Sequence, residues 1–476
     1  PVRVKAGVVY AGDFEWVGKE SLTDNSWMDL YKEHKKNGGN RKEFLRKASH
    51  IPGIYVPSLY ETTYNEDGTI ASFEPLYEDV PRTILKQVQM DLTNTFYPEK
   101  QIVPYIKVTQ DRCVLEIQRG CTRGCRFCQA GMIYRPLRER ALPMLEELAA
   151  KGIKGTGNDE ISLSSLSSSD YSHLPELCNY LIDNYRSKNI NIALPSLRID
   201  AFSLDVMSKV QDVRKSSLTF APEAGTQRMR DVINKGLTEE VILHGAMEAF
   251  KGGWSKVKLY FMMGLPTETE EDIKGIAHLA EKIAMNYYSM DAEYRHGRIS
   301  VGASASFFVP KPFTPFQWAS MCEEDEYKTK AHIVNDEFKI QHNHRSLSFK
   351  WHDAKTTVLE GILARGDRRI GKVIYDVYKK GCIYDAWTEF FNYEAWMETM
   401  EENGLDYHFY TTRKRELDEI FPWDFIDIGV KREWNNAMAE KVTPNCRQKC
   451  SGCGAAKFGG GVCYESKSKM DENRCS

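Results

Sequence analysis

The stretch VLEIQRGCTRGCRFCQAGMIYR, residues 114–135, decides the fold of this chain, because a strand pattern runs directly into a tight group of cysteines. Cys121, Cys125 and Cys128 have the spacing C-x3-C-x2-C, with Phe127 before the last. Thiolates on a short glycine-containing loop can hold three corners of a cubane iron–sulfur cluster. Three ligands leave one iron open for a small molecule, as catalytic zinc sites keep an open position. The competing hypothesis is a zinc site that borrows a distant fourth ligand.

Length, charge, apolar runs and cysteine count limit the classes of protein to which this chain can belong. At roughly 150 residues per domain, 476 residues predict about three domains. The 64 basic and 67 acidic residues give a net charge of −3, which indicates no global attraction to nucleic acid or to a membrane surface. No apolar run is long enough for a transmembrane helix, and no signal-peptide pattern begins the chain. Twelve cysteines in a long, signal-less, Lys- and Glu-rich chain predict metal sites in a reducing, cytoplasmic setting rather than disulfides.

Short β-rich runs alternate with helical patterns after residue 111. The strand-like runs are 114–118, 161–164, 190–195, 218–222, 257–264 and 299–308, and the helical segments between them are 137–151, 175–187, 239–250 and 271–287. Such alternation predicts parallel βαβ units in an α/β fold. Periodicity leaves open whether they form an open sheet or a barrel. We expect an N-terminal appendage at 1–110 with a hairpin at 65–68, this core at 111–310, a helical aromatic-rich domain at 311–440 and a Cys-rich tail at 441–476.

The first cysteine loop, placed after the first strand of a βα series, resembles the radical S-adenosylmethionine (SAM) superfamily. The resemblance implies a partial (β/α)6 TIM-like barrel with a 4Fe–4S cluster whose open iron binds SAM. It also implies an enzyme that cleaves SAM reductively to a 5′-deoxyadenosyl radical, with an electron donor of the flavodoxin or ferredoxin type. The catalytic residues, the substrate and the oligomeric state are not indicated by the sequence.

Several motifs resemble the segments that contact SAM in that superfamily. They are SLSSLSSSDY at 162–171, PSLRID at 195–200, FAPEAGTQRMRDVINKGLT at 220–238 and FMMGLPTETEED at 261–272. The cofactor-binding residues that the resemblance implies, together with the aromatic residue of the cysteine loop, are Phe127, Ser164, Arg198, Glu223, Met263 and Gly264.

Three of these assignments have competing explanations. Glu223 would hold the ribose or ammonium group of SAM, or would simply be a carboxylate favoured at a helix N-terminus. Arg198 would bind the SAM carboxylate through its fork geometry, or would form a salt bridge with a neighbour such as Asp200. Ser164 would contribute backbone contacts to the SAM amino group, or belong to a polar loop.

A second group, CRQKCSGCGAAKFGGGVC at 446–463, repeats the spacing and adds a fourth cysteine. Cys446, Cys450, Cys453 and Cys463 predict a closed site, either an auxiliary iron–sulfur cluster or a four-cysteine zinc site. Most of the chain from about residue 27 resembles an uncharacterised family of cobalamin-domain-linked radical SAM proteins. Because only 26 residues precede that region here, we expect the cobalamin domain to be lost or truncated and cobalamin to be an unlikely cofactor of this chain.

The helical region carries two further polar motifs. His352 beside Asp353 could serve proton transfer, and the group Arg365, Arg368 and Arg369 could bind an anionic substrate, a phosphate or RNA. The competing explanations for these motifs are a capped helix start and a surface ion-pair network.

The leading function is a radical SAM enzyme, with RNA modification or methylthiolation and peptide or small-metabolite modification both open. The alternatives are a non-catalytic iron–sulfur electron-transfer or scaffold protein and a zinc-stabilised binding module.

Overall fold

The chain folds around two parallel sheets that carry the predicted strands in sequence order. The computed structural model describes residues 2–5, 8–11, 26–106, 108–193, 218–295 and 297–459. The first sheet has the order β11-β10-β7, formed by β7 (Cys113–Glu116), β10 (Glu160–Ser164) and β11 (Asn191–Ala193). The second has the order β12-β13-β14-β15, formed by β12 (Leu218–Glu223), β13 (Lys256–Met263), β14 (Ser300–Phe307) and β15 (Leu347–Trp351). Every pairing in both sheets is parallel.

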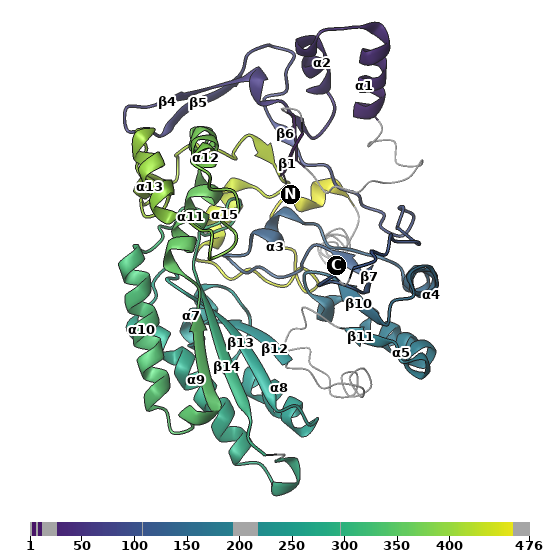
Figure 1. Cartoon of the computed structure of the whole chain (residues 1–476), viewed down its shortest axis with the longest axis vertical. Helices are drawn as coiled ribbons and strands as arrows, with labels where there is room; N and C mark the ends of the chain where they lie inside the picture. The colour runs from purple at the N-terminus through teal and green to yellow at the C-terminus, as the bar shows by residue number, and fades with distance from the viewer. Residues whose placement is uncertain are drawn as a thin grey trace, which may run out of the picture.

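Helices follow the strands and cover them from outside (Figure 1). The first sheet is followed by α4 (Leu142–Thr156) and α5 (Leu174–Tyr185), the second by α8 (Glu239–Lys251), α9 (Glu270–Tyr288) and α10 (Glu324–Ile340). Along β13 buried side chains alternate with more exposed ones. The buried Leu259 and Phe261 face the helices that cover the sheet. A capping box at Thr269 and Asp272 fixes the start of α9 directly after the β13 turn. The core is therefore a partial TIM-like barrel, as the sequence predicted.

The N-terminal region lies against the C-terminal part of the chain rather than standing alone. It consists of β1 (Val2–Lys5), β2 (Val8–Ala11), α1 (Ser26–Asn37), α2 (Arg41–Ala48), β3 (Ile54–Tyr55), β4 (Tyr60–Tyr64), β5 (Ile70–Pro75) and β6 (Ile84–Leu85). Strands β4 and β5 form the hairpin predicted at residues 65–68. β6 pairs in parallel with β16 (Ile426–Asp427), so chain segments more than three hundred residues apart share one small sheet.

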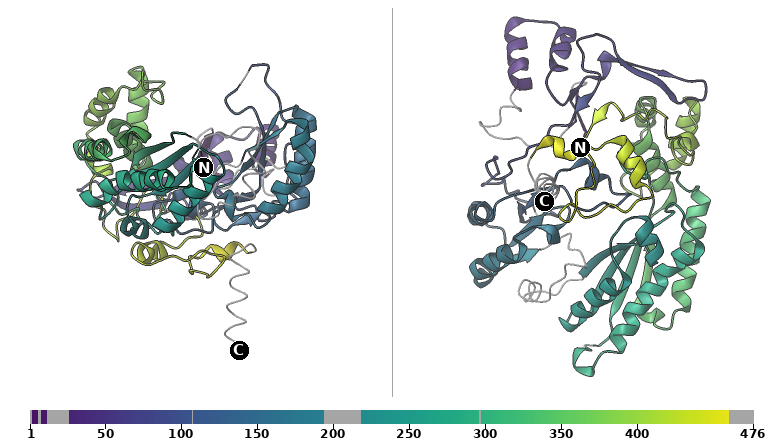
Figure 2. Two further views of the ribbon diagram at one scale, coloured as in Figure 1. Left: turned by 90° about the horizontal axis from the view of Figure 1, so that it is seen from below. Right: turned by 180° about the vertical axis from the view of Figure 1, so that it is seen from behind.

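The residues after β15 are mainly helical, whereas β15 itself is a strand of the second sheet within the stretch 311–440, where the sequence predicts a helical domain. The helices after β15 are α11 (Ala354–Arg365), α12 (Ile370–Lys379), α13 (Tyr393–Glu402), α14 (Tyr407–Tyr410) and α15 (Arg432–Met438). The aromatic residues Tyr393, Trp396 and Tyr410 pack into a core with Val373 and Ile362, which agrees with an aromatic packing role. Figure 2 shows these helices on the side of the molecule opposite to α4 and α5. None of the helices in the described part of the chain is long and apolar enough to cross a membrane.

One helix begins later than predicted. The pattern at 137–151 predicts a helix from residue 137, whereas α4 begins at Leu142. Residues before it form β9 (Arg138–Glu139), which pairs antiparallel with β8 (Gln118–Arg119). Arg138 and Arg140 are buried there and donate hydrogen bonds to backbone carbonyls. The tertiary contacts of these arginines therefore override the local helical pattern.

Candidate functional site

The first cysteine loop begins where β8 ends and finishes at the start of α3 (Gln129–Ile133). Gly120 opens the loop at a φ of +88°, where a Cβ would lie 2.7 Å from the carbonyl oxygen of Tyr134. Only glycine tolerates both that conformation and that approach. Cys128 is the N-cap of α3, and its Sγ accepts the N–H of Gly131 at 3.4 Å. The backbone N–H of Arg123 points to Cys121 Sγ at the same distance.

The three cysteines of this loop are half-buried, and their surroundings disfavour the thiolate form of Cys121 and Cys128. Burial raises the pKa of Cys121, and the charge of Cys125 raises it further. Burial also raises the pKa of Cys128 to about 12, with contributions from Cys125 and Cys121. Within the described residues, no three Cys, His, Asp or Glu side chains are drawn together in a metal-binding geometry. The donor set nonetheless fits an iron–sulfur cluster, since iron would compensate thiolate charge that the buried loop alone disfavours.

A network of arginines fixes the loop from outside. Arg123 forms a two-point ion pair with Asp170, which follows β10, at 2.7 and 3.1 Å. Arg135 is buried and donates to the carbonyl oxygens of Gly131 at 2.8 Å and Arg123 at 2.9 Å. Arg126 donates to Met438 O at 2.7 Å. The sequence pattern did not single out Arg123 and Arg126, because Asp170 and Met438 lie far away from them in the chain.

Phe127 brings the loop to the carboxyl ends of the second sheet. It packs in an apolar cluster with Ala224, which follows β12, and with Leu265 and Met262 at the end of β13. In parallel βα barrels, ligands bind at this end of the strands. Phe127 therefore connects the loop to the strand ends that carry Glu223, Met263 and Gly264.

Glu223 ends β12 with a φ of +68°, an uncommon conformation for a residue with a side chain. Its carboxylate pairs with Lys235 Nζ at 3.0 Å, and the two side chains are only 17% and 11% exposed. The charge of Lys235 in turn lowers the pKa of Cys128. The ion pair therefore stands beside the cysteine loop, and Glu223 has a specific partner in addition to any helix dipole.

The turn after β13 is tightly built. Gly264 has a φ of +82°, and a Cβ there would lie 2.7 Å from Tyr327. Its N–H donates to Glu268 Oε2 at 2.7 Å, while Lys330 Nζ lies 3.4 Å from the same oxygen. Burial raises the pKa of Glu268 to about 7. Met263 is fully buried and belongs to the core between the second sheet and its helices.

The remaining sequence-predicted residues are placed as follows. Ser164 ends β10, and its carbonyl oxygen accepts the N–H of Ile117 at 3.0 Å. Arg198 and Cys463 lie outside the described residues. Asp353 caps α11 by accepting the N–H of Thr356 at 2.9 Å, which is the helix-cap alternative for the His352–Asp353 motif.

The second group of cysteines is docked on the first loop. Cys446 N–H donates to Thr122 O at 2.9 Å, directly beside Cys121. Asn234 Nδ2 joins the two segments by donating to Gly124 O and to Thr443 O, each at 3.0 Å. Cys450 Sγ accepts the N–H of Gly452 at 3.4 Å, and Cys453 packs in an apolar cluster with Trp434 and Met132. The tail therefore forms one wall of the first cysteine loop.

Residues 115–280 match the family model described as the radical SAM superfamily. An uncharacterized protein of Methanocaldococcus jannaschii is 34% identical over 305 residues, which are 62% of this chain and 63% of that protein. An uncharacterized methyltransferase of Pyrococcus horikoshii is 22% identical, over 51% of this chain and 50% of that protein. The chain thus matches between half and just under two thirds of the length of these relatives.

Among solved structures, the radical SAM methyltransferase TsrM from Kitasatospora setae, with cobalamin and a 4Fe–4S cluster bound, is similar at a TM-score of 0.38 and 13% identity. The match covers 62% of this chain and 53% of that one. A domain of this family implies SAM and a 4Fe–4S cluster, and the cysteine loop lies within the matched residues. The chain therefore contains a radical SAM domain at residues 115–280.

Proposed function

We propose that this radical SAM enzyme holds a 4Fe–4S cluster on Cys121, Cys125 and Cys128 and binds SAM at the open iron. The observation that carries the proposal is the position of the cysteine loop, which Phe127 joins to the ends of β12 and β13. When bound and reduced, the cluster supplies the electron that cleaves SAM to methionine and a 5′-deoxyadenosyl radical.

The residues of this chain would orient SAM and exclude water. The N–H groups of Arg123 and Gly131 aim at the sulfurs of Cys121 and Cys128 and stabilise thiolate charge. Glu223, held by Lys235, offers a carboxylate to the polar groups of SAM. Gly264 lets the side chains of Tyr327 and Cys322 pack directly against the β13 turn, which fixes the backbone of that turn.

The second group of cysteines supports an auxiliary metal site in this proposal. Cys446, Cys450 and Cys453, with Cys463 as the fourth ligand, would hold an iron–sulfur cluster, or zinc as the alternative. The docking of Cys446 on Thr122 supports a role next to the first cluster.

Anoxic reconstitution tests the proposal directly. The protein with a fully formed cubane cluster, reduced by dithionite and supplied with SAM, is expected to release 5′-deoxyadenosine, measured by liquid chromatography and mass spectrometry. SAM is also expected to change the EPR spectrum of the reduced cluster. A loaded cluster with an unchanged spectrum and no product would favour the non-catalytic electron carrier, and a colourless zinc protein would favour the binding module.

The substrate class and partners are part of the proposal. We propose a cytoplasmic enzyme with a flavodoxin- or ferredoxin-type electron donor, acting on a peptide or small metabolite rather than on RNA. The net charge of −3 supports a peptide or small metabolite over RNA as the substrate, because the phosphate backbone of RNA is attracted to basic surfaces. Crosslinking to tRNA at low and moderate salt tests it: retention of the crosslink at moderate salt would make RNA the substrate. The relative described as a methyltransferase supports group transfer as the reaction type.

A further inference from the structure

Two buried arginines of the helical region form no salt bridge with a carboxylate of the described residues. Arg365, the last residue of α11, has no exposed surface, and Arg415 is 3% exposed. Arg365 Nη1 donates to Ala319 O at 2.8 Å and to Thr411 O at 3.3 Å. Arg415 Nη2 donates to Arg365 O at 3.0 Å. Neutral carbonyl groups thus replace the ion pair that a buried charge normally requires.

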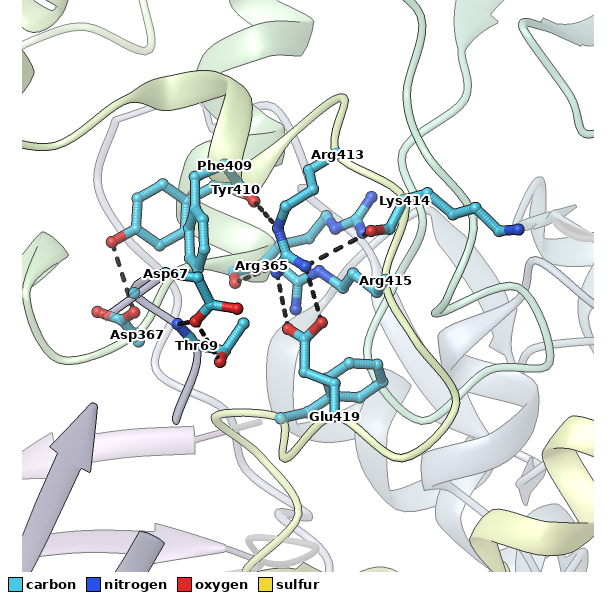
Figure 3. Close-up of polar contacts among 12 residues, drawn as sticks. Asp67, Thr69, Arg365, Asp367, Phe409, Tyr410, Arg413, Lys414, Arg415 and Glu419 are labelled. Carbon is cyan, nitrogen blue, oxygen red and sulfur yellow. Dashed lines mark hydrogen bonds and ion pairs between the residues drawn. The ribbon is translucent and has the colours of Figure 1, made fainter. Parts of the chain in front are cut away.

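The nearby carboxylates are already paired with other arginines. Asp367 binds Arg369 at 2.5 Å, and Glu419 binds Arg413 through both oxygens at 2.7 and 2.8 Å. Figure 3 shows Arg413 on Glu419, with the side chains of Arg365 and Arg415 beside this pair. The two buried guanidinium groups, those of Arg365 and Arg415, therefore have no carboxylate of their own among these pairs.

Three donor groups of these arginines point to a missing acceptor. Nε and Nη2 of Arg365 and Nε of Arg415 are buried and have no hydrogen-bond partner within the described structure. Burial lowers the pKa of Arg365 and brings that of Arg415 to about 10, and each positive charge disfavours the others. Both side chains line a narrow space of about 10 Å³, which is about the room that one water-sized atom needs.

A larger cavity opens beside this narrow space. Its volume is about 290 Å³, and it lies between the β4–β5 hairpin and the segment at 420–425. Aromatic rings dominate its walls, namely Tyr55, Tyr64, Phe73, Phe421 and Phe425. Ile70, Asp367, Ile420 and Pro422 line both spaces, so the two lie side by side. Thr62 Oγ1 is buried, lacks a hydrogen-bond partner in the described structure, and belongs to the larger cavity.

We propose that this cavity binds a small aromatic carboxylate, with its ring among the aromatic walls and its carboxylate toward Arg365 and Arg415. A cavity of this size with apolar walls and a few convergent polar groups is typical of a small-molecule site. A planar carboxylate matches the guanidinium fork and suits the narrow space better than a tetrahedral phosphate does. Arg365 therefore does not bind RNA, because its guanidinium is inaccessible to a polymer, whereas Arg369 of the same motif forms an ion pair with Asp367. The site is distinct from the cysteine loop and does not depend on radical chemistry.

Binding of 4-fluorobenzoate to the full chain, followed by fluorine NMR and calorimetry, tests the proposal. We expect saturable binding of this probe, and binding weaker by at least roughly tenfold for neutral 4-fluorobenzamide, which has the ring but no charge. Acetate, which has the charge but no ring, is expected to bind as weakly. Equal affinity for the benzoate and the benzamide, or no saturable binding of the benzoate, would overturn the proposal.

Two variants locate the binding. Arg415→Met is expected to weaken 4-fluorobenzoate binding by roughly tenfold or more and to leave benzamide binding unchanged. Ile420→Trp fills the cavity and is expected to abolish binding of both probes, which keeps the proposal testable if Arg415→Met fails to fold. Arg295→Met, on an exposed turn beyond α9, is the matched control and is expected to bind like the unaltered chain. Unchanged benzoate affinity in either cavity variant, with its circular dichroism spectrum intact, would contradict the assignment.

Discussion

The two cysteine groups share the spacing C-x3-C-x2-C but occupy different surroundings. The first follows a barrel strand and ends as the N-cap of α3, with its thiols buried beside charged groups. The second lies in an extended tail after α15, where Cys446 packs on Leu137 and Cys453 packs in an apolar cluster. Only the first is joined to the strand ends, through Phe127.

This difference indicates that the spacing of the cysteines decides which thiols can share a metal. The position of the loop in the fold decides which other residues and ligands can reach that metal. A loop at the carboxyl end of a parallel strand shares its space with the other strand ends, where ligands bind. A loop in a tail offers only its own residues. We therefore expect open, ligand-binding chemistry at the first group and a closed, supporting site at the second.

The largest expected effect comes from removing the first group. Cys125→Ala is expected to abolish SAM-dependent release of 5′-deoxyadenosine, because two thiolates do not hold a cubane cluster in this loop. Iron and sulfide content, together with the EPR spectrum, report the loss of the cluster. Cys382→Ala, at a partly exposed cysteine between α12 and α13, is the control and is expected to behave like the unaltered chain. Product formation by the Cys125→Ala protein would place the active cluster elsewhere.

Removing the second group is expected to have a smaller effect on SAM cleavage. Cys450→Ala is expected to lower the iron content without a loss of zinc and to reduce 5′-deoxyadenosine by roughly tenfold, the size typical of groups outside the immediate ligand shell. Elemental analysis beside the activity assay measures both. A loss of zinc instead of iron would identify a structural zinc site. An unchanged metal content would contradict a metal at this group.

The sequence predicted those parts of the molecule that local patterns encode. Strands β7, β10, β11, β12, β13 and β14 appear within a few residues of their predicted bounds, since each combines a short apolar run with a following helical period. The edge strand β15 was not predicted. The pairing of β6 with β16 was not predictable, because neither two-residue strand has a pattern of its own. In the same way, the positions of Arg123 and Asp170 gave no sign of their ion pair. Contacts between segments that are distant in the chain depend on the folded arrangement, which one sequence does not reveal.

Glu268 is buried at the turn after β13, one of the strand ends near the first cysteine group. Its burial predicts that the stability of the folded chain depends on pH. The pKa of Glu268 is about 7 in the folded chain against an ordinary value of 4.5, mainly because of burial. The folded state therefore binds the proton more tightly, and its stability falls as pH rises from about 4.5 to 7. The full shift corresponds to on the order of 3 kcal/mol. Glu268→Gln is expected to remove this slope in urea unfolding measured across the same pH range.

Glu326→Gln provides the matched control for this prediction. Glu326 also faces Lys330, at 3.5 Å, but its side chain is 52% exposed, so water stabilises its charge. This substitution is expected to leave the pH slope in place. A slope that persists in Glu268→Gln would mean that the carboxylate is ionised throughout the range and that solvent reaches the β13 turn.

The smallest expected effect tests the contact between the two cysteine groups. A Cβ at Gly124 would lie 2.4 Å from Thr443 Cβ, so Gly124→Ala is expected to push the tail away from the first loop at a cost of about 1–3 kcal/mol in unfolding free energy. Thr443→Gly removes the obstructing atoms, so the double variant is expected to be more stable than the sum of the single effects predicts. Urea unfolding of the four proteins measures this coupling. Strict additivity would mean that the tail does not rest on Gly124, and the second group would then be independent of the first.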